Sequence, residues 1–190
     1  MMTTEVIFAG FGGQGILSMG KFLAFGGMVE NRNVSWCPSY GPEMRGGTAN
    51  CSVVLSTEEI GSPIITAPDA LVVMNRPSLE KFEGMVKPGG LIILDSNLIT
   101  VDVKRTDVKV LRVPCQDEAE KIGSKTIANM ILLGALIEST EVIPMESLLT
   151  ALKEHGKEKF FDMNNAALQV GASYVKAAVM EKEFMRIGIE

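Results

Sequence analysis

The feature that most constrains the fold is an apolar run that ends at a cluster of glycines and continues as a helical pattern. Residues 6–9 are apolar, and Gly10, Gly12 and Gly15 follow with the spacing G-x-G-x-x-G. Glycines at these places allow a tight turn, close approach of a ligand to the backbone and close packing of the helix on the strand. The first amides of a helix have no partner within it, so together with the helix dipole they favour an anion. The sequence therefore predicts a strand, turn and helix suited to phosphate.

The same pattern opens dinucleotide-binding domains, which place an acidic residue about 20 positions later at the end of the second strand. Glu30 lies at this distance, but residues 28–33 are typical of a helix end and a turn. The expected second strand, residues 34–37, has no acid at its tip. A stand-alone NAD-dependent dehydrogenase or redox-sensing nucleotide-binding protein stays open as the alternative function. A glycine turn that only packs the helix on the sheet is the alternative without a ligand.

Apolar strands alternate with helical patterns along the rest of the chain. We expect strands at residues 50–56, 70–74, 91–95 and 108–113, and helices at residues 13–29, 116–122, 127–139 and 164–185. A short helix is expected from Asn75, with Pro77 in its first turn. This alternation indicates a mainly parallel sheet covered on both faces. The predicted fold class is α/β, a single three-layer Rossmann-like domain spanning residues 1–190.

Two of the helices carry further expectations. Residues 127–139 are almost entirely apolar apart from Asn129 and Glu138, which predicts a helix buried within the domain or against another chain. If residues 127–137 form a surface, the isolated chain is expected to form a homodimer through it. The final helix is predicted to direct one small and apolar face inward: Ala167, Val170, Gly171, Tyr174, Val175 and Ala178.

Composition narrows the class of partner and the chemistry. The net charge of −5 and the pI near 5.1 argue against nucleic acid or an anionic membrane as a partner, because both need clustered Lys and Arg. The chain has no apolar stretch of the ~20 residues that cross a bilayer and no signal-peptide pattern at its start, so we expect a cytoplasmic protein. Cys37, Cys51 and Cys115 form no C-x-x-C pair, and His155 is the one histidine. We expect buried, reduced thiols rather than zinc or iron–sulfur ligands.

A second informative segment, residues 39–50, is expected to be a loop between strands. It combines a tyrosine, two charges and several glycines. Arg45 can bind a phosphate or carboxylate in a bidentate fork, while the amides of Gly46 and Gly47 face the same anion. A surface loop held by a Glu43–Arg45 ion pair remains the alternative.

Three segments together resemble a known family. They are Gly10-Phe-Gly-Gly-Gln-Gly15, Tyr40-Gly-Pro-Glu-Met-Arg-Gly-Gly-Thr-Ala-Asn50 and Met74-Asn-Arg-Pro-Ser78. In order and wording they are similar to the gamma subunit, or fused gamma domain, of 2-oxoacid:ferredoxin oxidoreductases. The resemblance covers essentially the whole chain and is greatest to the 2-oxoglutarate synthase branch. Pyruvate, branched-chain 2-oxoacid and indolepyruvate enzymes are near relatives.

The resemblance implies an enzyme built from several chains, of which this one is not catalytic alone. Thiamine diphosphate and Mg2+ are expected between alpha and beta subunits, and iron–sulfur clusters in partner chains that include a ferredoxin-like delta subunit and pass electrons to ferredoxin. This chain is expected to support assembly and the coenzyme A entrance while binding no cofactor alone. The predicted contact residues are Gly10, Gly12, Gly13, Gln14, Gly15, Tyr40, Glu43, Arg45, Gly46, Gly47, Thr48 and Asn50.

The sequence offers no catalytic side chain. His155 falls at a polar helix end, where a solvated histidine is expected rather than a general base. Asp95 and Asn97 follow a strand and are expected to make a turn. Ser18 follows the glycine turn without the G-x-S-x-G spacing of a hydrolase nucleophile.

Overall fold

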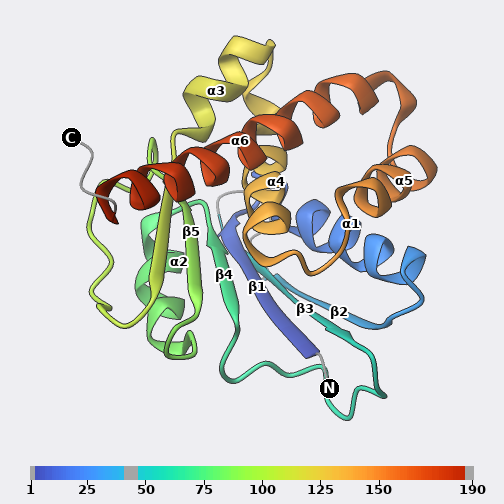
Figure 1. Cartoon of the computed structure of the whole chain (residues 1–190). Helices are drawn as coiled ribbons and strands as arrows, with labels where there is room; N and C mark the ends of the chain where they lie inside the picture. Colours follow the sequence, from blue (N-terminus) through green and yellow to red (C-terminus); the bar gives the residue numbers. More distant parts are fainter. Residues whose placement is uncertain (1–2, 41–46, 187–190) are drawn as a thin grey trace.

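A computed structural model of the chain describes residues 3–40 and 47–186; the side chains of Tyr40 and of residues 181–186 are outside the description. Six strands form one sheet in the order β2-β3-β1-β4-β5-β6 (Figure 1). Their bounds are β1 Thr3–Phe11, β2 Asn33–Tyr40, β3 Thr48–Ser56, β4 Ala70–Val73, β5 Leu91–Asp95 and β6 Lys109–Val113. β1, β4, β5 and β6 pair in parallel, whereas β3 runs antiparallel to both β1 and β2. The predicted α/β class with a mainly parallel sheet is confirmed.

The β2–β3 hairpin differs from the loop expected at residues 39–50. Ser39 pairs with Asn50 and Tyr40 with Ala49, so both ends of the expected loop belong to strands. Seven residues, 41–47, separate the two strands. A parallel connection needs a crossover of a dozen or more residues, so this link allows only an antiparallel pair. β3 consequently lies between β1 and β2.

Helices cover the two faces of the sheet unequally (Figure 1). One face carries α1 (Ile16–Val29), α4 (Ala128–Thr140), α5 (Met145–His155) and α6 (Phe161–Arg186), with α3 (Cys115–Ile122) beside them. The other carries α2 (Arg76–Phe82) and the loops after β3 and β5. Short 3-10 turns at Glu83–Met85, Lys125–Ile127 and Glu158–Phe160 connect elements. The helix α5 was not predicted, apart from its polar end.

The apolar helix α4 is buried within this chain. Every residue from Ala128 to Ile137 is buried in the isolated chain. α6 crosses α4 at Gly134 and Gly171, where a Cβ on either glycine would collide with main-chain atoms of the opposite helix. A helix buried within the domain is therefore confirmed, and residues 127–137 offer no surface for the homodimer considered above.

The burial of each cysteine depends on whether a helix covers its side of the sheet. Cys51 on β3 and Cys115 on α3 are buried, and burial raises the pKa of Cys51 to about 12. Cys37 is exposed, so the expectation of three buried thiols is wrong at this position. It pairs with Ser52, on the sheet face opposite the buried Cys51 and Val53. On that side of the β2–β3 hairpin Ser39 is exposed, and Ser35 and Ser52 are partly buried. Cys37 is exposed because the hairpin lacks the cover that α1 gives the other face.

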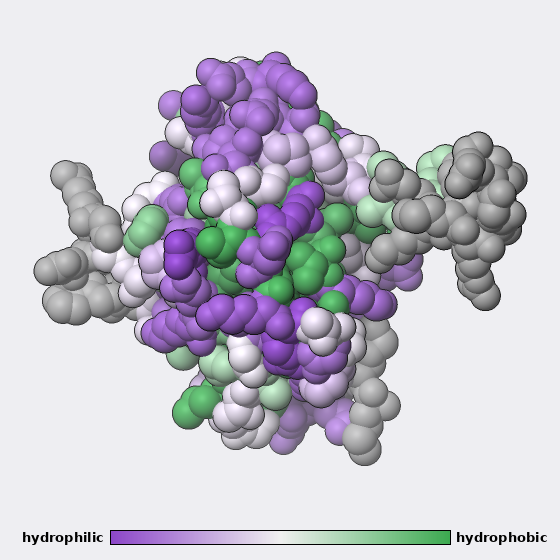
Figure 2. Space-filling model, turned by 90° about the vertical axis from the view of Figure 1, so that its left-hand side faces the viewer, coloured by the Kyte–Doolittle hydropathy of each residue, from purple (hydrophilic) through white to green (hydrophobic). Residues whose placement is uncertain are grey.

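The two edges of the sheet differ in charge. β6 has five residues, of which Lys109 and Arg112 are charged. A cavity of about 470 Å³ lies between β6 and α6, lined in part by Val110 and Val179. Figure 2, viewed from the left-hand side of Figure 1, shows hydrophobic residues gathered at the centre of that face within a hydrophilic surround. β2, the opposite edge, has eight residues and no charge. Among the described residues, no helix is long and apolar enough to span a membrane.

Candidate anion-binding site

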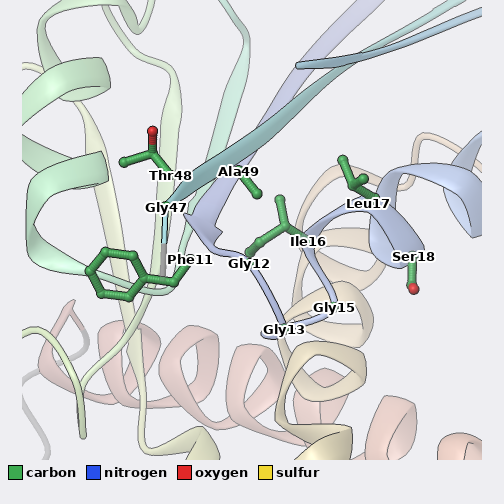
Figure 3. A pocket seen from close by; sticks show the side chains of 10 residues that line it. All are labelled: Phe11, Gly12, Gly13, Gly15, Ile16, Leu17, Ser18, Gly47, Thr48 and Ala49. Carbon is green, nitrogen blue, oxygen red and sulfur yellow. The ribbon is translucent and has the colours of Figure 1, made fainter. Parts of the chain in front are cut away.

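The candidate site lies where β1 passes into α1. A cavity of about 510 Å³ is bounded on one side by the glycine turn with the first residues of α1 and on the other by the start of β3 (Figure 3). Its lining residues are Phe11, Gly12, Gly13, Gly15, Ile16, Leu17, Ser18, Gly47, Thr48 and Ala49. The two motifs predicted from sequence to act together, the glycine turn and the end of the 39–50 segment, thus lie on one cavity.

The backbone of the turn explains why glycines occupy it. Gly13 has φ +95° and Gly15 has φ +77°, a region that side chains with a Cβ disfavour. A Cβ on Gly15 would also collide with the amide of Asn129, which donates from Nδ2 to the Gly15 carbonyl at 3.2 Å. Gly10 is buried, and a Cβ there would lie 2.6 Å from both Gln14 Oε1 and Ile16 Cδ1.

The helix that starts at this turn has no side-chain cap among the described residues. Gly15 is the N-cap residue and has no side chain to accept a bond, and the first turn of α1 carries no acidic residue. In an α-helix the first three amides, here those of Ile16, Leu17 and Ser18, have no acceptor within the helix. These three residues line the cavity. The positive end of the α1 dipole therefore faces an open space of ligand size.

Other groups of the turn are used internally. The Gly12 amide donates to the Gly47 carbonyl at 3.0 Å, which ties the turn to β3. Gln14 bridges two strands: its Oε1 accepts from the Phe11 amide at 2.6 Å, and its Nε2 donates to the Met74 carbonyl at 3.1 Å. Gln14 therefore fixes the turn to the residue that follows β4.

The remaining predicted contact residues are Tyr40, Glu43, Arg45, Gly46 and Asn50. Asn50 pairs with Ala9 on β1 and does not line the cavity. Tyr40 ends β2, with its side chain outside the description. Glu43, Arg45 and Gly46 lie outside the described residues. The expected Arg45 fork and Glu43–Arg45 pair therefore stay predictions.

The acid needed by a dinucleotide site is not at this turn. Glu30 follows the last residue of α1, and its Oε1 accepts a hydrogen bond from Ser147. A helix of 14 residues is about 21 Å long at 1.5 Å per residue, which separates Glu30 from the glycine turn. In addition, β3 lies between β1 and β2, so the end of β2 is not adjacent to the turn. This arrangement does not favour the dehydrogenase alternative.

The residues considered for catalysis have structural partners. Asp95 is fully buried and accepts from the Asn97 amide at 3.0 Å and from Gln116 Nε2 at 2.8 Å. Burial raises the pKa of Asp95, although these hydrogen bonds oppose the shift. His155 is exposed and stacks on Phe25, with 3.6 Å between ring centroids. The described residues contain no group of three His, Cys, Asp or Glu side chains placed to hold a metal.

Three asparagines make hydrogen bonds at this edge of the sheet; the sequence predicted a helix start at Asn75 and a turn at Asn97, but no role at the site for Asn129. Asn129 donates a hydrogen bond to the Gly15 carbonyl. The sequence feature that could have indicated this role is a single side-chain amide within an apolar run. Asn75 caps α2, because its Oδ1 accepts from the Ser78 amide at 2.8 Å. Asn97 caps α3 through Oδ1, which accepts from the Gln116 and Asp117 amides at 2.9 and 3.2 Å.

Fold and site together define a Rossmann-like α/β domain with an open glycine turn and an antiparallel hairpin at one edge. The family model described as pyruvate ferredoxin/flavodoxin oxidoreductase matches residues 5–174. The chain belongs to this family.

Individual relatives agree with this assignment. The chain is 43% identical over 175 residues to ketoisovalerate oxidoreductase subunit VorA of Methanothermobacter thermautotrophicus, covering 90% of this chain and 36% of VorA. It thus spans about a third of that relative's length. It is 32% identical over 178 residues to 2-oxoglutarate synthase subunit KorC of Methanocaldococcus jannaschii, covering 92% and 95% of the two chains. The crystal structure of the keto/oxoacid ferredoxin oxidoreductase gamma subunit from Geobacter sulfurreducens superposes with a TM-score of 0.81 at 27% identity, covering 92% and 99%.

Proposed function

We propose that this chain is the gamma component of a thiamine-diphosphate-dependent 2-oxoacid:ferredoxin oxidoreductase in the cytoplasm. In this reaction a 2-oxoacid loses CO2, two electrons pass to ferredoxin, and the acyl group is transferred to coenzyme A. Thiamine diphosphate and iron–sulfur clusters, held by alpha, beta and delta partner chains, supply the decarboxylation and the electron transfer. Membership of the family and the likeness to a gamma subunit over nearly its whole length support the proposal.

The role proposed for this chain itself is to bind the phosphates of coenzyme A. The main observation in support of this role is the N-terminus of α1, which has no side-chain cap and whose first three residues line a cavity of about 510 Å³. Backbone amides and a helix dipole are suited to a pyrophosphate, and a guanidinium adds a bidentate partner. Arg45 is the predicted guanidinium. The chain positions the acceptor and performs no bond-making step.

The experiment for this role uses the assembled complex with Arg45→Ala. We expect the KM for coenzyme A to rise at least tenfold while the KM for the 2-oxoacid changes little. Arg76→Ala is the control, because Arg76 is exposed and paired with Glu80 on α2. An unchanged KM for coenzyme A would remove Arg45 from the site. Pull-down of the same variant tests the competing role, in which residues 40–50 dock a partner subunit.

Two 2-oxoacids are candidates for the substrate. The wording of the three motifs and the match to KorC over 95% of that subunit support 2-oxoglutarate. The higher identity to VorA supports ketoisovalerate, a branched-chain 2-oxoacid. The ratio of kcat/KM for the two acids, measured by ferredoxin reduction with the purified complex, decides between them. A preference for pyruvate would contradict both.

A ligand screen separates the proposal from the dehydrogenase alternative. Stabilisation of the folded chain by a ligand raises its thermal midpoint. We expect NADH, NADPH and FAD to leave this midpoint unchanged, whereas coenzyme A raises it. A shift with a dinucleotide alone would favour the alternative.

A further inference from the structure

A second cavity, of about 410 Å³, lies away from the glycine turn, between α1 and the edge strand β2. Lys21, Phe25 and Met28 line it from α1, and Arg32 and Trp36 line it from the other side. Positions 21, 25 and 28 are four and three residues apart, so they share one face of the helix. The cavity is therefore a groove between one helix face and the edge of the sheet.

The groove contains positive charge that the described part of the chain does not neutralise. Neither Lys21 nor Arg32 has a carboxylate within 4 Å among the described residues, although the chain has a net charge of −5. Lys21 Nζ instead lies 5.4 Å from the centre of the Phe25 ring. Arg32 Nη1 is buried and has no hydrogen-bond acceptor within residues 3–40 and 47–186. A buried donor without an acceptor is unfavourable, so the charge and the hydrogen bonding both suit an acidic occupant.

The same groove exposes apolar surface and unpaired backbone. Met28 is 59% exposed and Trp36 is 38% exposed. In the part of the chain that the structure describes, β2 pairs with β3 alone, so one row of its main-chain groups has no strand partner there. Natural edge strands are usually short or charged, which prevents pairing with another chain. β6 follows this rule, whereas β2 has eight uncharged residues and is interrupted as a main-chain donor at Pro38.

We propose that this groove docks an extended segment of a partner subunit that carries acidic and apolar side chains. The carboxylates meet Lys21 and Arg32, the apolar side chains cover Trp36 and Met28, and the backbone pairs with β2. A second copy of this chain fits less well, because a twofold interface would bring the two cations against the same residues. The inference rests on the proposed function, since it takes its partner from the same complex.

The experiment measures assembly of the full chain with its alpha and beta partner subunits. We expect the double variant Lys21→Glu/Arg32→Glu to raise the Kd of assembly at least tenfold, because two favourable contacts become repulsive. The matched control is Lys157→Glu/Lys159→Glu. These lysines are exposed and have no carboxylate partner among the described residues, and Lys159 Nζ also lies near a ring, 4.9 Å from Phe160. The control is expected to assemble like the wild type.

Several outcomes would overturn the inference. A double variant that assembles with wild-type Kd contradicts it while leaving the proposed function intact, whereas a wild-type chain that does not assemble contradicts both. Amide hydrogen exchange of the wild-type complex avoids the risk of a misfolded variant: residues 33–40 should exchange at least tenfold more slowly than in the free chain. Unchanged exchange there, or a dimer of the free chain that the double variant abolishes, would overturn the inference.

Discussion

The strands β1 and β4 are parallel neighbours that each lead into a helix at the same edge of the sheet, yet the two helices begin differently. α2 is capped by its own chain, because Asn75 accepts a hydrogen bond from Ser78. α3, beyond β6, is capped as well, by Asn97. α1 begins after glycines and has neither a side-chain cap nor an acid in its first turn.

This difference shows which helix start is available for a ligand. A capped helix has its donors satisfied and its dipole partly offset, so it has little affinity for an anion. Among the described residues α1 has no side-chain cap, and its first residues line a cavity. The left-handed backbone of Gly15 and its contact with Asn129 exclude a capping side chain at the N-cap position, and this leaves the start of α1 open to an anion.

The largest effect on stability is expected from Gly15→Val. The left-handed φ and the collision with Asn129 together should cost about 2–4 kcal/mol of unfolding free energy. Gly13→Ala is the control, because its φ is positive but nothing lies within 4 Å of the added Cβ, so it should cost about 1 kcal/mol. Urea unfolding measures both. Equal losses would mean that the contact with Asn129 does not matter.

Removing the cap of α2 should cost less. Asn75→Ala leaves the Ser78 amide without its acceptor and should lower the unfolding free energy by about 1 kcal/mol. Because Asn75 lies outside the cavity, the KM for coenzyme A should not change. A changed KM with unchanged stability would reverse the roles assigned to the two helix starts.

An acidic residue in the first turn of α1 should stabilise the isolated chain but weaken the binding of coenzyme A. Ser18→Asp puts a carboxylate in the first turn of α1 and should stabilise the isolated chain by about 0.3–1 kcal/mol. The same carboxylate repels phosphate, so the KM for coenzyme A in the complex should rise at least tenfold. Ser18→Asn is the uncharged control. If the chain is stabilised but the KM for coenzyme A is unchanged, the glycine turn only packs the helix on the sheet and binds no phosphate.

The smallest effect concerns pH. Burial raises the pKa of Asp95 in the folded chain above its ordinary value of 3.8. Its contribution to stability is therefore fully present below that value and is lost as the pH rises through the folded pKa. Asp95→Asn should remove this part of the pH dependence, measured as urea midpoints between about pH 3 and pH 7. If the urea midpoint of Asp95→Asn changes with pH as steeply as that of the wild type, the pKa of Asp95 is not raised.

Much of the fold could be predicted because apolar periodicity marks buried strands and helices directly. The strand at residues 70–74, the Asn75 helix start and the apolar helix near residues 127–139 were predicted and are present as β4, α2 and α4. The antiparallel β3 was not, since the pattern within a strand does not reveal its direction. The exposure of Cys37 was missed for a related reason, because it depends on which sheet face lacks a helix.

The candidate site could be predicted only in part. Glycine spacing identified the turn, since positive φ and close contacts restrict the residue type there. Gly47 and Thr48 line the same cavity as the glycine turn, and their contact with a ligand stays a prediction. Asn129 contacts Gly15 across 114 positions of the chain, and no local pattern reports such a contact. The roles of Glu43 and Arg45 stay predictions.

The central claim, that the open start of α1 binds the phosphates of coenzyme A, is tested most directly by amide hydrogen exchange of the assembled complex with and without coenzyme A. Residues 12–18 are predicted to exchange at least tenfold more slowly with coenzyme A, while residues 75–82 keep their rates. Unchanged exchange at residues 12–18 under saturating coenzyme A would contradict the claim.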